Sequence, residues 1–112
     1  MKPASAIAAL ERQLSAKGPA VTMRREKGKS VLVATVRGFV RGAKPEELAP
    51  GVSQDARSVV LSPTGFAAWQ PLPMKGDLCR VGEDAFAQVV SAEIVRMNDV
   101  PVRINLIVEV MT

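Results

Sequence analysis

The sequence predicts a mainly β fold, namely a small antiparallel β-barrel or sandwich of about six strands with one short N-terminal helix and a long internal loop. Val is abundant, which favours strands. Short apolar runs alternate with turn signals, and residues 100–110 place apolar side chains at a strict period of two. We therefore expect one domain over residues 1–112, with a helix in 1–17 and the barrel in 18–112.

The N-terminal segment from Pro3 to Ala16 is typical of a short helix. Pro3 suits a first helical turn, where a missing N–H costs nothing, and apolar residues recur at i, i+3 and i+7. Gly18 and Pro19 then end the helix. Because a helix this short is marginal alone, we expect it to pack on the barrel or on a neighbouring subunit.

Two strands are expected next, over residues 20–25 and 31–41, joined by a polar turn at 26–30. The second strand has apolar residues on both faces, so we expect much of it to be covered on both sides. Residues 42–57 show neither a helix nor a strand period. A loop of this length is unusual in a small domain. Two interpretations stay open: a solvated excursion, or an arm that becomes ordered against a partner subunit.

The middle of the chain predicts a short strand at 58–61 and a single helical or 3₁₀ turn at 66–69. Trp69, at the end of this turn, is expected to fill the core. Two prolines follow. Since proline cannot donate to a β-ladder, residues 70–74 should cross an edge or end of the sheet.

Two hairpins are expected to close the fold. A turn at 75–77 precedes a strand at 78–81, and a reversal at 82–84 leads to a strand at 85–95. An Asn-Asp hairpin turn at 98–99 introduces the last strand. Alternation in the fifth strand assigns one face to Phe86, Val90 and Ile94 and the other to Val89 and Val95.

The composition argues against an enzyme. The chain has no His, which removes the commonest general base and the serine-type triads. Its single cysteine, Cys79, cannot form a structural zinc site and is expected to be a buried thiol. Turn chemistry explains the carboxylates of Asp77, Glu83 and Asp84, and no nucleotide or metalloprotease motif occurs. We expect no enzymatic activity, metal or cofactor.

Targeting and membrane signals are also lacking from the sequence. No apolar run approaches the roughly 20 residues that a membrane helix needs. The N-terminal segment lacks the long apolar stretch of a signal peptide. We therefore expect no membrane association.

The net charge of +4 is unevenly distributed. Residues 1–50 carry ten Lys and Arg against four Asp and Glu, whereas residues 51–112 carry five against seven. A basic face attracts nucleic acid or acidic protein surfaces, although it also serves solubility. The candidates for such a contact lie in the first hairpin, at Arg24, Arg25, Lys27 and Lys29.

Residues 57–110 resemble the head–tail joining, or head-closure (stopper), proteins of long-tailed phages and gene transfer agents. The matching pattern is a strand ending in Ser (VVLS), a turn (PTGF), a Pro-containing crossing with a Gly-Asp turn (PMKGD), a strand with a Gly turn (LCRVGED) and two long closing strands. The preceding strand pair and the 42–57 loop also fit this layout. The departures are the sparse aromatic content of the closing hairpin and the alanine-rich N-terminal helix.

The resemblance implies a virion protein of the neck, made in the cytoplasm of a bacterial host. About six or twelve copies are expected to form a heterologous ring that closes the DNA exit channel. The implied partners are a portal or adaptor ring above and a tail terminator or tail tube below, with non-specific contact to packaged DNA and none to membrane. The 42–57 loop is then the candidate for the channel lumen or an adjacent ring, through Lys44, Glu46, Glu47 and Asp55.

Two alternatives stay open. Another neck or tail ring protein, such as a tail terminator, would also be β-rich. A small barrel that binds nucleic acid is the second, and the basic hairpin favours it. Such modules usually expose aromatic side chains for base stacking, and this chain has few.

Overall fold

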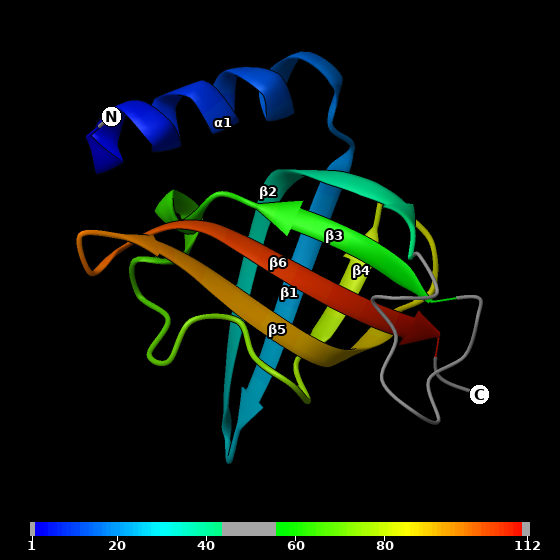
Figure 1. The fold of residues 1–112 in the computed structure, drawn as a ribbon. Coiled ribbons are helices and arrows are strands. Elements are labelled where there is room, and N and C mark those ends of the chain that lie inside the picture. Colours follow the sequence, from blue (N-terminus) through cyan, green and yellow to red (C-terminus); the bar gives the residue numbers. More distant parts are fainter. Residues whose placement is uncertain (1, 44–55, 111–112) are drawn as a thin grey trace.

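The structure, a computed structural model, describes residues 2–43 and 56–110. Its elements are α1 (Pro3–Lys17), β1 (Ala20–Lys27), β2 (Ser30–Gly42), β3 (Arg57–Leu61), the 3₁₀ turn η2 (Pro63–Phe66), β4 (Leu78–Val81), β5 (Ala87–Met97) and β6 (Val100–Val110). The strands pair antiparallel in the order β1-β2-β3-β6-β5-β4. Pairing of β1 with β4 closes this sheet into a barrel (Figure 1). The predicted fold class is therefore confirmed, in its barrel form.

Most element boundaries agree with the sequence prediction to within two residues. The η2 turn is the main exception because it begins three residues earlier than expected. Ser62 explains this start, since its side chain accepts a hydrogen bond from the Thr64 amide and Pro63 occupies the first helical position. The hairpin turn at Asn98 and Asp99 is confirmed, because both residues have positive φ, as a two-residue hairpin requires.

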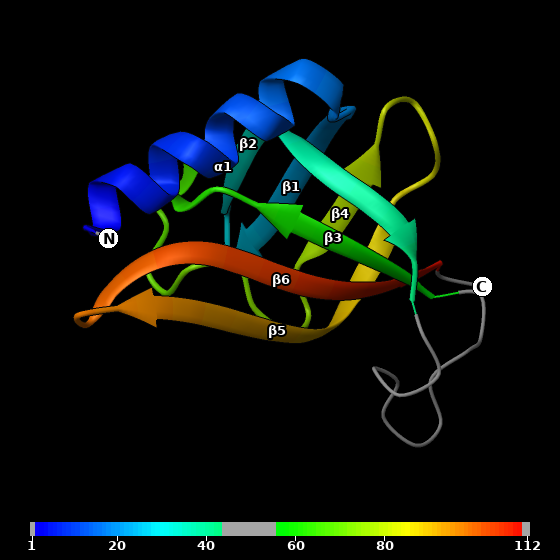
Figure 2. The ribbon, with the colours of Figure 1, turned by 45° about the horizontal axis from the view of Figure 1, so that its top comes forward.

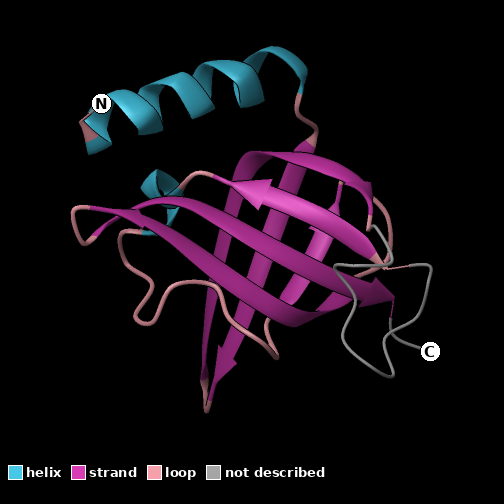
Figure 3. Ribbon diagram, in the orientation of Figure 1, coloured by secondary structure: helices cyan, strands magenta, loops and turns pink. Residues whose placement is uncertain are grey.

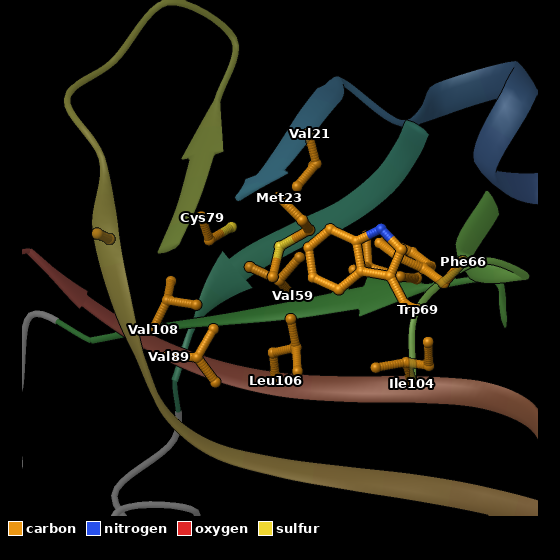
Figure 4. Packing of buried hydrophobic residues seen from close by; sticks show 12 residues of the cluster. Val21, Met23, Val59, Phe66, Trp69, Cys79, Val89, Ile104, Leu106 and Val108 are labelled. Carbon is orange, nitrogen blue, oxygen red and sulfur yellow. The ribbon is translucent and has the colours of Figure 1, made fainter. Parts of the chain in front are cut away.

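The core fills the barrel interior (Figure 4). Side chains from β1, β3, β4, β5 and β6 converge there with Phe66 and Trp69. The last strand contributes through its period of two, burying Val102, Ile104, Leu106 and Val108. Trp69 is 4% exposed, so its predicted place in the core is confirmed.

The predicted faces of β5 are wrong beyond its third residue. Val89 pairs with Val108 and Ser91 with Ile107, so Val90 is an extra residue that forms a β-bulge. The bulge reverses the alternation. Val89 and Ile94 therefore share the interior side of the strand, although strict alternation placed them on opposite faces.

The outer face of β2 is another correction. We expected both faces to be covered, but Val31, Val33 and Phe39 are 47%, 58% and 49% exposed. The other face of β2 packs against the core instead, through Leu32, Ala34, Val36 and Val40. Among the described elements, helix α1 and the η2 turn contact β2 besides its neighbouring strands, and the helix reaches only part of the strand (Figure 2). Val31, Val33 and Phe39 are thus left on the surface as an apolar stripe that Thr35 and Arg37 interrupt.

Helix α1 lies outside the barrel, against β2 and β6 (Figure 3). Leu14 is its buried anchor, and the Ser62 hydroxyl donates a hydrogen bond to Glu11 at 3.0 Å. The helix ends at Gly18, whose amide donates to the Leu14 carbonyl. A Cβ at Gly18 would collide with the Gly38 carbonyl oxygen, so glycine permits the close approach of the helix end to β2. The expected packing of this helix on the barrel is confirmed.

Gly38→Ala should destabilise the barrel by about 1–3 kcal/mol, the usual cost of overpacking. A Cβ at this position would lie 2.8 Å from Val21 Cγ2 and 2.9 Å from Leu61 Cδ2, both in the core. Gly42→Ala is the matched control on the same strand, because its Cβ would meet nothing within 4 Å. Urea unfolding of both variants checks the prediction, and equal unfolding midpoints would contradict it.

Candidate functional site

The β1–β2 hairpin projects beyond the barrel (Figure 1). Strand β4 pairs with β1 only through Val21–Arg24, and β3 pairs with β2 only from Gly38. Residues 25–32 consequently pair only with each other around a turn at Gly28, which has a φ of +59°. We call residues 25–32 the β1–β2 ribbon.

Two of the basic candidates lie where an external partner could reach them. Lys29 is exposed at the tip of the ribbon. Arg24 lies at its base, with 39% of its side chain exposed, and makes an ion pair with Glu26 at 3.2 Å. Lys27 belongs to β1, but its side chain lies outside the described part of the structure.

Arg25 points into the barrel, so it is not available for the external contact predicted for it. Its residue is 7% exposed, and its Nε and Nη2 donate to the two carboxylate oxygens of Asp77 at 2.8 and 2.7 Å. The guanidinium also donates to the carbonyls of Pro71 and Leu72 and lies 4.7 Å from the centre of the Trp69 ring. These four groups all lie within residues 69–77, which we call the crossing segment, and they surround one side chain from β1.

This arrangement holds the crossing segment against the barrel. Asp77 is 5% exposed and also accepts the Met74 amide at 2.9 Å, so it supports both the turn and the ion pair. Trp69 meets Phe66 edge to face, with ring centroids 5.3 Å apart. Sequence reasoning assigned Asp77 to turn chemistry alone and missed its partner. The bidentate pair of Arg25 and Asp77 has its donors and acceptors engaged within the fold, so its role is structural.

The second predicted contact region falls mostly outside the described residues. Lys44, Glu46, Glu47 and Asp55 all lie there. The structure does describe the two ends of the loop, which meet where the Ala43 amide donates to the Ala56 carbonyl at 3.0 Å.

The described residues contain no cluster of three or more side chains able to hold a metal ion. Cys79 is buried, as predicted, and burial raises its pKa to about 12 because the thiolate loses its hydration. No described helix is long and apolar enough to cross a membrane.

A groove of about 660 Å³ lies between the crossing segment and the β5–β6 hairpin. Phe66, Trp69, Leu72 and Ile94 give it a mainly apolar lining. Arg96 is the charged residue among those that line it.

Comparisons with protein-family models, with curated proteins and with solved structures found no match. The function of this chain is therefore inferred from its geometry and from the resemblance in its sequence. Its strongest structural features are a closed barrel, a projecting ribbon and exposed apolar side chains.

Proposed function

We propose that this chain is a structural virion protein, a head-closure ring subunit of a phage or gene transfer agent. About six or twelve copies would close the DNA exit channel below the portal or adaptor and provide the platform on which the tail docks. The proposed family comes from the sequence resemblance over residues 57–110, and the closed barrel is compatible with that family.

The exposed apolar stripe on β2 is the observation that carries the proposal. Val31, Val33 and Phe39 are each about half exposed on a strand whose opposite face packs against the core. Val31 and Val33 are neighbours on this face, whereas Thr35 and Arg37 separate them from Phe39. Exposed apolar side chains grouped on one strand face favour contact with other proteins. The buried pair of Arg25 and Asp77 is engaged internally, so its role is in the fold rather than at a surface contact.

The uneven charge supports a ring with two different contact faces. A heterologous ring joins one surface of each subunit to a different surface of the next. Arg24 and Lys29 place positive charge at the β1–β2 hairpin, whereas Glu93 and Glu109 on the closing strands are balanced by Arg96 and Arg103. The charged hairpin would steer its subunit toward an acidic surface of a partner.

Deleting the gene tests the role in the particle. We expect heads that package DNA but do not retain it and carry no tails, because both the closure and the docking platform are lost. A tail terminator acts on the tail alone, so its deletion should leave closed, DNA-filled heads beside tails of abnormal length. Electron microscopy of the particles separates these outcomes, and normal infectious particles would exclude both.

Nucleic-acid binding is the second candidate, and Arg24 and Lys29 favour it because they present charge at a projecting ribbon. It predicts oligonucleotide binding that weakens steeply with salt. Arg24→Ala should reduce the slope of log K against log salt by about one, as expected for one phosphate contact. Surface Arg12→Ala, on the helix, is the charge-matched control. Absence of binding at low salt would exclude this candidate.

A further inference from the structure

Strand β5 has an unpaired backbone edge beside the apolar groove. One edge pairs with β6 from Ala87 to Met97, but β4 pairs with the other only at Ala87 and Gln88. Val89 still exchanges hydrogen bonds of 2.9 Å with the turn at Gly76–Asp77. Beyond it, from Ser91 to Met97, no backbone–backbone hydrogen bond reaches this edge within the described residues.

The groove lies along this free edge. Ala92, Ile94 and Arg96 of β5 contribute to its lining. A strand added to the edge would therefore direct every second side chain into the groove. The mainly apolar lining favours apolar side chains on that face of the added strand.

Strand β2 has a second unpaired edge. From Ser30 to Arg37 it pairs with β1 on one side, and its pairing with β3 begins only at Gly38. The η2 turn lies against the end of this β2 edge, at Val36. Residues 30–35 of β2 and 91–97 of β5 are therefore the comparable free edges, six and seven residues long. The ribbon projects from the barrel, so its edge is accessible to another molecule (Figure 1).

The two edges also match in chemistry. Strand β2 presents Leu32 and Ala34 on one face and the exposed Val31 and Val33 on the other. Neither free edge contains a proline or a lysine, the residues that commonly block edge pairing.

We propose that the free edge of β2 from one copy pairs with the free edge of β5 on the next copy. The sheet then continues between subunits, with the partly buried Leu32 and Ala34 of one copy beside the apolar groove of the next. Because the two edges are different surfaces of the same chain, the contact is head to tail and generates a ring or a filament. This inference deepens the proposed ring function and rests on it for its biological meaning.

Cysteine pairing between two variants of the purified chain tests the contact. Val31→Cys and Val33→Cys place a thiol on the outward face of β2, and Ser91→Cys and Glu93→Cys place one on the outward face of β5. Residues opposite each other in paired strands have Cα atoms about 4.5–5.5 Å apart, within disulfide range. Each β2 variant is mixed with each isotope-labelled β5 variant, oxidised and analysed by mass.

At least one mixture should form a disulfide heterodimer in excess of both homodimers. Wild-type protein is one control, since Cys79 is buried. Val110→Cys is the other, because Val110 is 55% exposed but lies on neither free edge, and it should show no preference for a partner. No preferred heterodimer in any of the four mixtures would overturn the proposal.

A blocking variant gives an independent readout. Ala92→Lys adds an ammonium to the free edge of β5 and should weaken self-association by about tenfold or more. Val110→Lys is the control and should leave it unchanged. Unchanged association of Ala92→Lys would overturn the proposal, provided that its circular dichroism and unfolding midpoint match the wild type.

These measurements use the isolated chain, so they separate this inference from the proposed function. A selective heterodimer would stand even if the chain were absent from virus-like particles. Conversely, if the chain is found in particles but the purified variants form no selective heterodimer, the proposed function stands and this contact is excluded.

Discussion

Replacing Asp77 by Ala should destabilise the protein by about 3–5 kcal/mol, because it leaves the guanidinium of Arg25 buried without its counter-ion. The two side chains are 8% and 6% exposed, so water cannot replace the lost partner. The Met74 amide loses its acceptor as well. A domain of this size has roughly 5–15 kcal/mol of stability, and much of it would be lost. Urea unfolding followed by circular dichroism measures the change.

The surface pair of Arg57 and Asp84 is the matched control. Its side chains are 49% and 68% exposed and its charged atoms lie 3.6 Å apart. Asp84→Ala should therefore cost less than about 1 kcal/mol. Equal losses for Asp77→Ala and Asp84→Ala would contradict a structural role for the buried pair.

The double variant Arg25→Met/Asp77→Leu separates charge from packing. It removes both charges together, so it should be more stable than Asp77→Ala alone. Recovery should be partial, because the carbonyls of Pro71 and Leu72 lose their donor. A double variant less stable than the single one would show that the ion pair itself, rather than the unpaired charge, dominates.

Trp69→Ala should cost about 3–5 kcal/mol, the usual loss for a buried aromatic side chain. The indole is 4% exposed, meets Phe66 edge to face and covers the guanidinium of Arg25. Trp69→Phe keeps an aromatic ring in place and should lose less. Thermal unfolding, with the midpoint compared at matched concentration, checks the order of the two variants.

Phe39→Ala is the control for an aromatic side chain outside the core. Phe39 is 49% exposed, so its removal should change the free energy of unfolding by no more than about 0.5 kcal/mol. If Phe39→Ala destabilised the isolated chain as much as Trp69→Ala, the assignment of Trp69 to the core would fail.

The sequence predicted the strands and turns well because their signals are local. The final strand shows a period of two, and Asn98 and Asp99 tolerate the positive φ of a two-residue hairpin turn. The bulge at Val90 was missed because no residue type marks it. Only the pairing with β6 shows that one residue of β5 has no residue directly opposite it.

The sequence did carry a signal for the inward Arg25. Val21, Met23 and Arg25 occupy alternate positions of β1, so the period that buries the first two also directs Arg25 inward. Grouping it with the neighbouring basic residues by charge obscured this period. Its partner Asp77 is 52 residues away, and no local pattern links two residues at that separation.

The proposed function rests on features that no local pattern reveals. The ribbon projects because β3 and β4 stop short along their neighbours, and the apolar stripe stays exposed because no described layer covers it. Both observations favour assembly with other proteins.

Counting the chain in purified particles tests the central claim most directly. Quantitative mass spectrometry against a labelled standard, normalised to the portal subunit, gives the number of copies in each particle. A head-closure ring predicts about six or twelve copies. Absence of the chain from purified particles would contradict the proposed function.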